Sequence, residues 1–422
     1  MHILVVTPYF PPEVNACATR QFEHCRRWVA AGHQVTVITP APNAPNGVLF
    51  TGFRNRWKSE KWIDGIRIIR VWTLIRPNKG VFWRSLSFLS FMLRATCCAC
   101  FVRDVDVLVA TSGHFFTGLT GMLIRWLTRL PFVLEIRDVW PESIVAVGAM
   151  NRSIVIRTLE WLERRMYASA HHIVTVGEGY RQLLLQRGVA LEQLTIVSNG
   201  VDLTCWQPRL PDAMLRRSWS AEGGFVCAYV GTVGMAHGLE VVLHAAERLK
   251  RKGRFDVKFL IVGDGAKRAA LQQEAQRQGL DNVIFAGEIS RDQVPNVLTS
   301  CNAALVHLRG TELFGTVVPS KIFETMALNT PIIMGVRGLA LEIVLKAKAG
   351  VAMTPDDPDS LLHAIDHVCA YGDSYRHGRQ YARHFFDRDK LANKMLTILA
   401  RLASPMAERG DESYGMGISK AA

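Results

Sequence analysis

The chain has 422 residues, which is too long for one ordinary hydrophobic core and long enough for two domains. Hydrophobic residues make up 49% and charged residues 21%, a composition that excludes an intrinsically disordered chain. The formal net charge is +13, and residues 1–200 carry most of it, with 23 Lys and Arg against 13 Asp and Glu. A basic first half indicates an anionic partner (nucleic acid, anionic lipid or a phosphorylated acceptor) or else a generally basic surface.

The nine cysteines are an odd number, and their one cluster, Cys97, Cys98 and Cys100, has no second Cys or His pair at metal-ligand spacing nearby. We therefore expect reduced thiols in a cytoplasmic protein and no zinc site. The first residues, Met1–Thr7, lack the basic start and the cleavage site of a signal peptide, and we expect them to form a buried strand.

Short β-branched runs alternate with amphipathic helical stretches, which predicts an α/β protein with two doubly wound halves. The first strand, Ile3–Thr7, precedes a helix from about Thr19 that Gly32 ends. Turn residues and two prolines mark the seam between the halves, Ser198–Pro211. The other expected strands are Gln34–Thr39, Ile66–Val71, Val105–Ala110, Phe132–Ile136, His172–Val176, Thr195–Val197, Phe225–Gly231, Val257–Val262, Val283–Phe285, Ala303–Val306, Pro331–Met334 and Gly350–Met353.

The loop after the first strand, Pro8–Ala16, lacks the Gly-x-Gly-x-x-Gly pattern of a dinucleotide site. Its small residues Asn15 and Ala16 come before a helix N-terminus, where free amides and the helix dipole favour a phosphate group. The alternative is that this segment is a plain connecting loop.

A charged cluster follows the strand Phe132–Ile136. Acids, a base and a Trp lie between Glu135 and Glu142, at the carboxyl end of a strand, where pKa values can be tuned for proton transfer. A structural ion-pair network could produce the same pattern. The candidate catalytic residues of this cluster are Arg137, Asp138 and Glu142.

Three segments of the second half could hold a nucleotide. Gly231–Gly238 is a glycine-rich turn between a strand and a helix, of the kind that surrounds phosphate. Val262–Gly265 also follows a strand, although a single Gly-x-Gly is weak evidence. Lys321 lies at a helix start with Glu324 one turn later on the same face. The lysine can neutralise a pyrophosphate and the carboxylate can accept hydrogen bonds from a ribose diol, or the two form a surface ion pair.

Paired acids offer no convincing metal site, because Asp104-Val-Asp106 opens a strand and Asp356-Asp357 lies in a late loop. We expect lysine, arginine and helix termini to neutralise the charge of a leaving group instead. Neither a metal nor another cofactor is therefore expected.

Five segments, in this order, resemble glycosyltransferase family 4, which has the GT-B fold of two facing Rossmann-like domains. The resemblance covers about residues 1 to 400. It is greatest to the bacterial branch of L-fucosamine (N-acetyl) transferases of O-antigen and capsule assembly. The segments are Pro8–Glu13, Arg137–Ser143, Ser198–Asp202, Val262–Gly265 and Pro319–Ala327.

The resemblance implies retaining transfer of a sugar from a nucleoside-diphosphate donor, usually UDP-linked, to a glycan or polyprenyl-diphosphate-linked acceptor in cell-surface polysaccharide synthesis. It implies an acceptor-side domain over residues 1–200 and a nucleotide-sugar domain over residues 201–387. A helix over residues 388–403 would cross back to the first domain, and residues 404–422 would form a mobile tail.

The resemblance also assigns roles to the candidate residues. Glu324 would bind the ribose and Lys321 the diphosphate, while Asp138 would lie beside the reacting sugar, where the family often has His. The other expected donor residues are Ser320, Gly231, Thr232, His237, Gly263 and Arg309. The first-strand loop would close on the phosphate and acceptor through Glu13, Asn15 and Ala16.

Two departures from the family pattern concern the donor. Many members have Glu where this chain has Thr316, and Arg and Lys where it has Thr232 and His237. The missing Glu usually holds the donor sugar, so the identity of the sugar stays open. Lys321, together with Arg309, would then carry more of the diphosphate charge.

Other functions stay open at this point. A sugar-nucleotide epimerase or a phosphorylase could have the same fold, and the departures at Thr316, Thr232 and His237 would suit a catalytically idle lipid-binding subunit. The presence of Lys321, Glu324 and Asp138 argues against an idle subunit. No helix-turn-helix, zinc-finger or RNA-recognition signature supports nucleic-acid binding, so we expect none.

A long apolar run, Val81–Val102, approaches membrane-spanning length but is interrupted by Arg84 and Arg94. At helical spacing, Phe82, Leu86, Leu89 and Leu93 fall along one side, so the helix could lie in the membrane interface with its arginines at the headgroups. Gly121–Arg129 has a similar composition. The alternative is a pair of Rossmann helices buried against the sheet. The resemblance favours peripheral binding to anionic lipid at the cytoplasmic face of the bacterial membrane.

Overall fold

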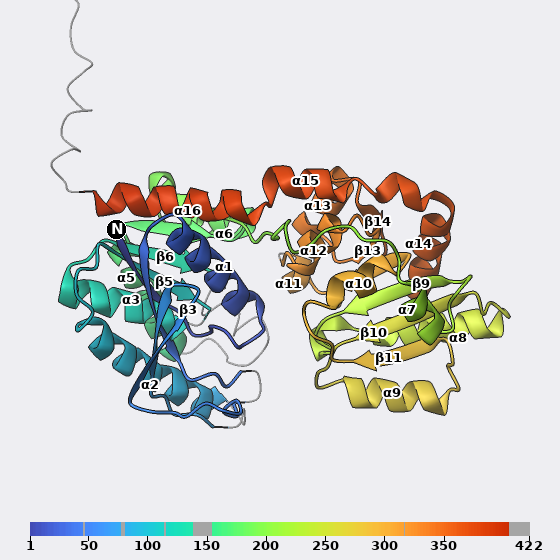
Figure 1. Cartoon of the computed structure of the whole chain (residues 1–422), viewed down its shortest axis with the longest axis horizontal. Helices are drawn as coiled ribbons and strands as arrows, with labels where there is room; N and C mark the ends of the chain where they lie inside the picture. Colours follow the sequence, from blue (N-terminus) through green and yellow to red (C-terminus); the bar gives the residue numbers. More distant parts are fainter. Residues whose placement is uncertain (45–46, 77–80, 114, 138–153, 316, 405–422) are drawn as a thin grey trace, which may run out of the picture. The chain divides into compact units, whose positions relative to one another are not determined.

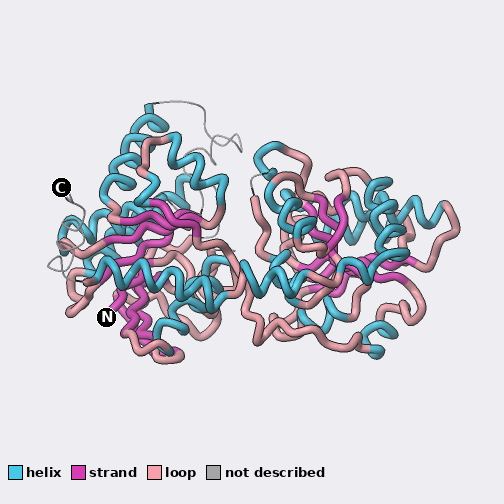
Figure 2. Tube along the Cα trace, turned by 90° about the horizontal axis from the view of Figure 1, so that it is seen from above, coloured by secondary structure: helices cyan, strands magenta, loops and turns pink. Residues whose placement is uncertain are grey.

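The computed structural model describes residues 1–44, 47–76, 81–113, 115–137, 154–315 and 317–404. The chain forms two compact units, one of Met1–Asn199 with Asp389–Ala422 and the other of Gly200–Arg388. Each unit is a mainly parallel sheet with helices on both faces (Figures 1 and 2). The predicted α/β class and two Rossmann-like halves are thereby confirmed. From residue 405 on, the expected tail lies outside the described residues.

The first unit contains an 8-stranded sheet in the order β3-β4-β2-β1-β5-β6-β7-β8. Neighbouring strands are parallel except for the antiparallel pair β3 and β4. The strand order reverses between β1 and β5, and ligands of open α/β sheets bind at such a point, beyond the carboxyl ends of the strands. The strands are β1 (His2–Val6), β2 (Gln34–Pro40), β3 (Lys58–Ile63), β4 (Ile66–Val71), β5 (Val107–Ser112), β6 (Phe132–Ile136), β7 (His172–Thr175) and β8 (Leu194–Ile196).

Alternating side chains of these strands build two cores, one on each face of the sheet. Ile3 and Val5 face a core completed by α1 and α16, whereas Leu4 and Val6 face a core completed by α2, α3, α5 and α6. Helix α16 also accepts a hydrogen bond at the carbonyl of Ala392 from the indole of Trp28 (3.1 Å). The helices are α1 (Ala16–Ala30), α2 (Val81–Ala99), α3 (Phe115–Thr128), α5 (Ile154–Ser169), α6 (Glu178–Gln186) and α16 (Arg388–Ala403).

The second unit contains a 6-stranded parallel sheet in the order β11-β10-β9-β12-β13-β14, which reverses between β9 and β12. Its strands are β9 (Phe225–Val230), β10 (Val257–Val262), β11 (Val283–Gly287), β12 (Ala303–His307), β13 (Ile332–Gly335) and β14 (Gly350–Ala352). Its α-helices are α7 (Ala213–Ser218), α8 (Glu240–Arg251), α9 (Arg268–Arg277), α10 (Val294–Thr299), α11 (Glu312–Gly315), α12 (Lys321–Ala327), α13 (Leu339–Lys346), α14 (Pro358–Tyr371) and α15 (Gly378–Phe385).

Two local expectations were wrong. Helix α1 begins at Ala16 and not near Thr19, because the Asn15 side chain caps it by accepting the amide of Ala18 (2.9 Å). The edge strand β3 was not expected. It lies in the aromatic and basic stretch before Ile66, and most of its side chains are exposed, so it lacks the apolar pattern of a core strand.

A buried ion pair ties the first unit together. The guanidinium of Arg20 on α1 donates to Glu135 at the end of β6 (2.7 Å), and both side chains are no more than 2% exposed. Arg20 also donates to the carbonyls of Val197 and Ser198 after β8, and Glu135 accepts from Gln21 and Thr111. Burial acts to raise the pKa of Glu135, but Arg20, Arg137 and these hydrogen bonds outweigh it and lower the pKa. Glu135 therefore belongs to a structural network.

We expect Glu135→Gln to destabilise the protein by about 3–5 kcal/mol, because it leaves the buried charge of Arg20 without a counter-ion. The free energy of unfolding of the first unit, from urea titration, measures the effect. Glu60→Gln is the control, since Glu60 pairs with Arg67 (2.6 Å) at the surface and should lose at most about 1 kcal/mol. Equal losses in the two variants would contradict the structural role of the buried pair.

Candidate functional site

Glycines at the carboxyl ends of β9 and β10 let two loops and a lysine come close together. Gly231 has φ +137°, and a Cβ there would lie 3.0 Å from Nζ of Lys321. A Cβ on Gly263 (φ +126°) would lie 2.0 Å from the carbonyl oxygen of Gly231. The space on the Cβ side of Gly263 is thus filled by backbone, which explains the glycine, and its role in donor binding stays a prediction. Gly231 makes room for the ammonium.

Lys321 begins α12 beside the reversal point between β9 and β12. Its Nζ is buried and has no hydrogen-bond partner among the described residues. The ammonium lies 4.1 Å from the centroid of the Tyr229 ring, a cation–π contact. Burial lowers the pKa of Lys321 from 10.5 to about 8, although Glu324 acts to raise it. A buried ammonium that lacks a hydrogen-bond acceptor among the described residues is a candidate anion-binding group.

His237 ends the short 3-10 turn that follows β9 and adds a second unsatisfied nitrogen. Its Nδ1 is buried and lacks a hydrogen-bond partner within the described part of the chain. Burial and the charge of Lys321 lower the pKa of His237 to about 4, so the imidazole is neutral at physiological pH. A neutral imidazole can donate one hydrogen bond to a ligand without adding charge.

Glu324 lies one turn after Lys321, with a side chain that is 26% exposed. Arg291 approaches its carboxylate at 3.3 Å. Burial raises the pKa of Glu324, and the charges of Arg291, Arg388 and Lys321 only partly offset this. Lys321 and Glu324 together line a cavity of about 30 Å³.

Three other predicted donor residues lie in the same unit with the following contacts. Arg309 donates to Glu240 (3.0 Å) and to the carbonyl of Met235 (2.8 Å), and its expected share in the diphosphate charge stays a prediction. Thr232 is exposed, and its carbonyl accepts from the hydroxyl of Tyr229 (2.6 Å). Ser320 is the N-cap of α12 but makes no side-chain capping bond.

His307, at the end of β12, was missed in the sequence because it closes an apolar run. It is buried, its Nδ1 donates to the carbonyl of His237 (2.7 Å) and its Nε2 accepts from the amide of Asp356 (2.9 Å). His307 therefore holds the glycine-rich turn in place. The sequence did contain a signal for a functional residue here, namely a polar residue at the carboxyl end of a strand beside the reversal point.

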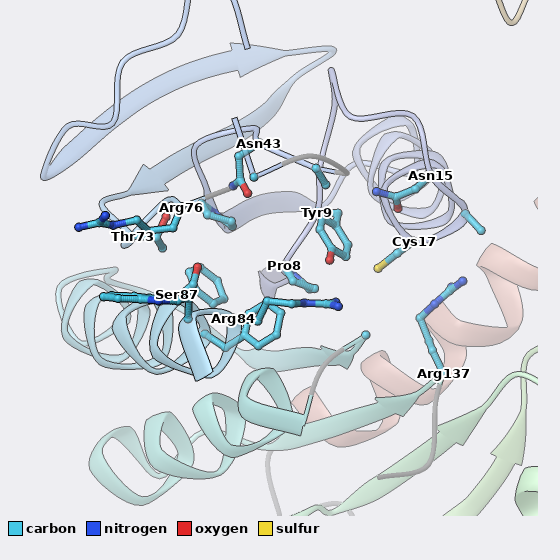
Figure 3. Close-up of a pocket in the computed structure, with 18 residues that line it drawn as sticks. Pro8, Tyr9, Asn15, Cys17, Asn43, Thr73, Arg76, Arg84, Ser87 and Arg137 are labelled. Carbon is cyan, nitrogen blue, oxygen red and sulfur yellow. The ribbon is translucent and has the colours of Figure 1, made fainter. Parts of the chain in front are cut away.

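A larger pocket, of about 430 Å³, lies in the first unit at the carboxyl ends of its strands (Figure 3). It contains the reversal point between β1 and β5, since Pro8 and Gly113 follow these two strands. Its charged lining residues are Arg76, Arg84 and Arg137, and the described lining includes no carboxylate. The rest of the lining is formed by Pro8, Tyr9, Asn15, Ala16, Cys17, Pro40, Asn43, Ala44, Gly47, Thr73, Trp83, Ser87, Phe88, Phe91 and Gly113.

The predicted phosphate loop is only partly in this pocket. Asn15 and Ala16 line it, at the N-terminus of α1. Glu13 does not, because it is 2% exposed and its carboxylate accepts the amides of Phe10 (3.2 Å), Asn43 (3.0 Å) and Ala44 (2.9 Å). Glu13 was expected to contact phosphate. In the structure it instead holds two loops together through these hydrogen bonds.

The predicted catalytic cluster is described only in part. Arg137 lines the pocket of the first unit, and its Nη1 is buried without a hydrogen-bond partner among the described residues. Asp138 and Glu142 lie outside the described residues, as does Thr316 of the second unit.

Two kinds of special site are absent from the described ranges, a metal cluster and a membrane-spanning helix. No three His, Cys, Asp or Glu side chains of the described residues come together as candidate metal ligands. None of the described helices is long and apolar enough to cross a bilayer.

Two mainly parallel Rossmann-like units with these sites define a protein of the GT-B class. Two family models match the chain, "Glycosyl transferase 4-like domain" over residues 15–200 and "Glycosyl transferases group 1" over residues 213–385. Together they cover most of the chain, which belongs to the glycosyltransferases that combine these two domains. The match favours an enzyme over an idle subunit.

Named relatives are also glycosyltransferases. The probable glycosyltransferase WbjE of Pseudomonas aeruginosa is 27% identical over 274 residues, 63% of this chain and 67% of that protein. The putative colanic acid biosynthesis glycosyl transferase WcaI of Escherichia coli strain K12 is 22% identical over 408 residues, 94% of this chain and 99% of that protein.

Solved structures share the fold over nearly the whole length. Sucrose-phosphate synthase from Thermosynechococcus elongatus has a TM-score of 0.71 at 18% identity, covering 95% of this chain and 98% of that one. HepE from Anabaena, in complex with UDP-glucose, has a TM-score of 0.69 at 17% identity, covering 95% and 100%. WaaG, a glycosyltransferase of lipopolysaccharide biosynthesis, has a TM-score of 0.66 at 14% identity, covering 94% and 99%.

We expect Lys321→Met to raise the melting temperature at pH 7, because it removes a buried cation whose Nζ has no hydrogen-bond partner among the described residues. The folded-state pKa of Lys321 is about 8, below its ordinary 10.5, so the unfolded chain binds more protons between these values. The buried charge therefore destabilises the folded protein by its full amount below pH 8, and this destabilisation disappears as the pH rises to 10.5. The gain from the substitution should shrink accordingly between pH 7 and pH 10 in calorimetry.

Lys346→Met is the matched control, since this lysine is exposed on α13 beside Glu342. It should change the melting temperature little at either pH. A destabilised Lys321→Met variant at pH 7 would show that the protein itself neutralises Lys321.

Proposed function

We propose that the protein transfers a sugar, with retention of configuration, from a UDP-sugar to a glycan or lipid-linked acceptor during synthesis of a cell-surface polysaccharide. The observation that carries the proposal is the buried, unpaired ammonium of Lys321 one turn before Glu324. The ammonium suits the diphosphate and the carboxylate suits the ribose diol. HepE bound to UDP-glucose and the name of the relative WcaI support this assignment.

The donor site would stabilise the departing diphosphate with protein groups. Lys321 supplies the charge, and the neutral imidazole of His237 and the glycine-rich turn supply hydrogen-bond donors at fixed positions. Transfer would then need neither a metal nor another cofactor. The identity of the sugar is left open by Thr316, which stands where the family often has the Glu that holds the donor sugar, and membership of the L-fucosamine (N-acetyl) transferase branch stays a prediction.

Lys321→Ala and Glu324→Ala should each lower kcat/KM for the UDP-sugar by roughly 10- to 100-fold, because each removes a charge-assisted hydrogen bond worth ~1.5–3 kcal/mol. Radiolabelled UDP-sugars with lipid-linked acceptors measure this, and EDTA should leave the rate unchanged. Lys346→Ala and Glu342→Ala, an exposed Lys–Glu pair on α13, are the matched controls. Wild-type kinetics in both site variants, or a loss with EDTA that Mn²⁺ or Mg²⁺ restores, would contradict the proposal.

The acceptor side is proposed to touch the cytoplasmic membrane through α2, as a peripheral contact. Phe91 of this helix is buried in the core, as the Rossmann-helix alternative requires, but Leu86, Leu89 and Leu93 are 36%, 36% and 55% exposed. The exposed side thus follows the predicted apolar stripe, flanked by Arg84. An apolar face bordered by arginines suits an anionic leaflet that contains a polyprenyl-diphosphate-linked acceptor.

Liposome flotation should recover the protein with anionic vesicles at low salt, and less of it at high salt or with neutral vesicles. Leu93→Glu should reduce the floated fraction severalfold, because it puts a charge into the apolar face. Leu210→Glu, at a leucine of the second unit that is 91% exposed, is the control. No flotation under any condition, or equal losses in the two variants, would exclude α2 as the contact.

A further inference from the structure

The pocket of the first unit has a strong imbalance of charge. Arg76, Arg84 and Arg137 come from three separate segments, and the described lining holds no acid to match them. In Figure 3, Arg84 extends from α2 beneath Pro8, and Arg137 extends from the end of β6 toward Cys17. Arg137 is the inner group, with its Nη1 buried, whereas Arg84 is exposed at the rim. Two guanidinium groups with a space between them suit a phosphate or a diphosphate.

The backbone adds further positive potential on the same side. Helix α1 has 15 residues, and its first residues Ala16 and Cys17 line the pocket. The first amides of a helix lack partners within the helix and carry the positive end of its dipole. Glu13, the nearby acid, has its carboxylate engaged by three backbone amides.

The other side of the pocket is apolar. Trp83, Phe88 and Phe91 of α2 line it, and Arg76 stacks over the Trp83 ring at 4.9 Å from its centroid. The next exposed residues of the same helix are the leucines Leu86 and Leu89. A ligand held by the arginines therefore continues along an apolar surface, which a nucleotide or a free sugar phosphate would not match.

We propose that this pocket binds the phosphate end of an isoprenoid phosphate or diphosphate, with Arg84 and Arg137 on the phosphate and the rings of α2 on the first apolar carbons. The volume of about 430 Å³ lies within the range of small-molecule sites. The inference rests on the proposed function, because it names the acceptor of that transfer, but the binding itself requires no donor.

Farnesyl diphosphate, inorganic pyrophosphate and UDP are the probes, titrated calorimetrically against the full chain. Arg84→Gln and Arg137→Gln should each weaken farnesyl diphosphate binding roughly 10- to 100-fold and leave UDP affinity within about twofold. Phe88→Ala should weaken farnesyl diphosphate but not pyrophosphate, because only the former has an apolar chain. Arg103→Gln, an exposed arginine of the same unit outside the pocket, is the control.

Three results would overturn the inference. The first is equal affinity for pyrophosphate and farnesyl diphosphate. The second is a loss of UDP affinity in the two arginine variants that is as large as their loss of affinity for farnesyl diphosphate. The third is that farnesyl diphosphate does not bind at all. Melting temperatures near the wild-type value would show that the variants fold. Failure of the proposed donor site has a different signature, namely unchanged UDP affinity in Lys321→Met, and it would leave the isoprenoid pocket intact.

Discussion

A buried charge needs a counter-charge, and among the described residues each unit pairs one acid with an arginine but leaves a cationic nitrogen without a hydrogen-bond partner at the carboxyl edge of the sheet. In the first unit, Glu135 is neutralised by Arg20, and Arg137 two residues later has a buried nitrogen without a partner in the described structure. In the second unit, Glu324 faces Arg291, and Nζ of Lys321 has no hydrogen-bond partner within the described part of the chain. This arrangement supports the proposal that each unit binds an anionic ligand.

Parallel topology explains why both cations lie where a ligand can reach them. The strand order of each sheet reverses once, between β1 and β5 and between β9 and β12, and connecting segments diverge there. In the second unit, the backbone packing of Gly231 against Gly263 brings the turn close to Lys321. The lysine then costs folding stability that an incoming diphosphate would recover.

The sequence was sufficient for the parts of the fold that depend on periodicity. Buried strands such as β4, β6 and β10 were predicted to the residue, because each is a short run of mostly apolar residues. Lys321 and Glu324 could be paired from their spacing on one helix, α12.

The partners of charged side chains could not be predicted, because they come from distant segments. Glu13 bonds to the amides of Asn43 and Ala44, and Arg309 to Glu240, and neither contact could be inferred from sequence spacing. Arg84 was interpreted only as a membrane arginine, although it also lines the pocket of the first unit.

The most direct test of the role of Lys321 is calorimetric UDP binding at pH 8.5 in two buffers of different ionisation enthalpy. A lysine with a pKa of about 8 is largely neutral there, so we predict that the wild type takes up a fraction of a proton when the diphosphate binds and that Lys321→Met takes up none. The same proton uptake in both proteins, or none in the wild type, would contradict the assignment of Lys321 to the diphosphate.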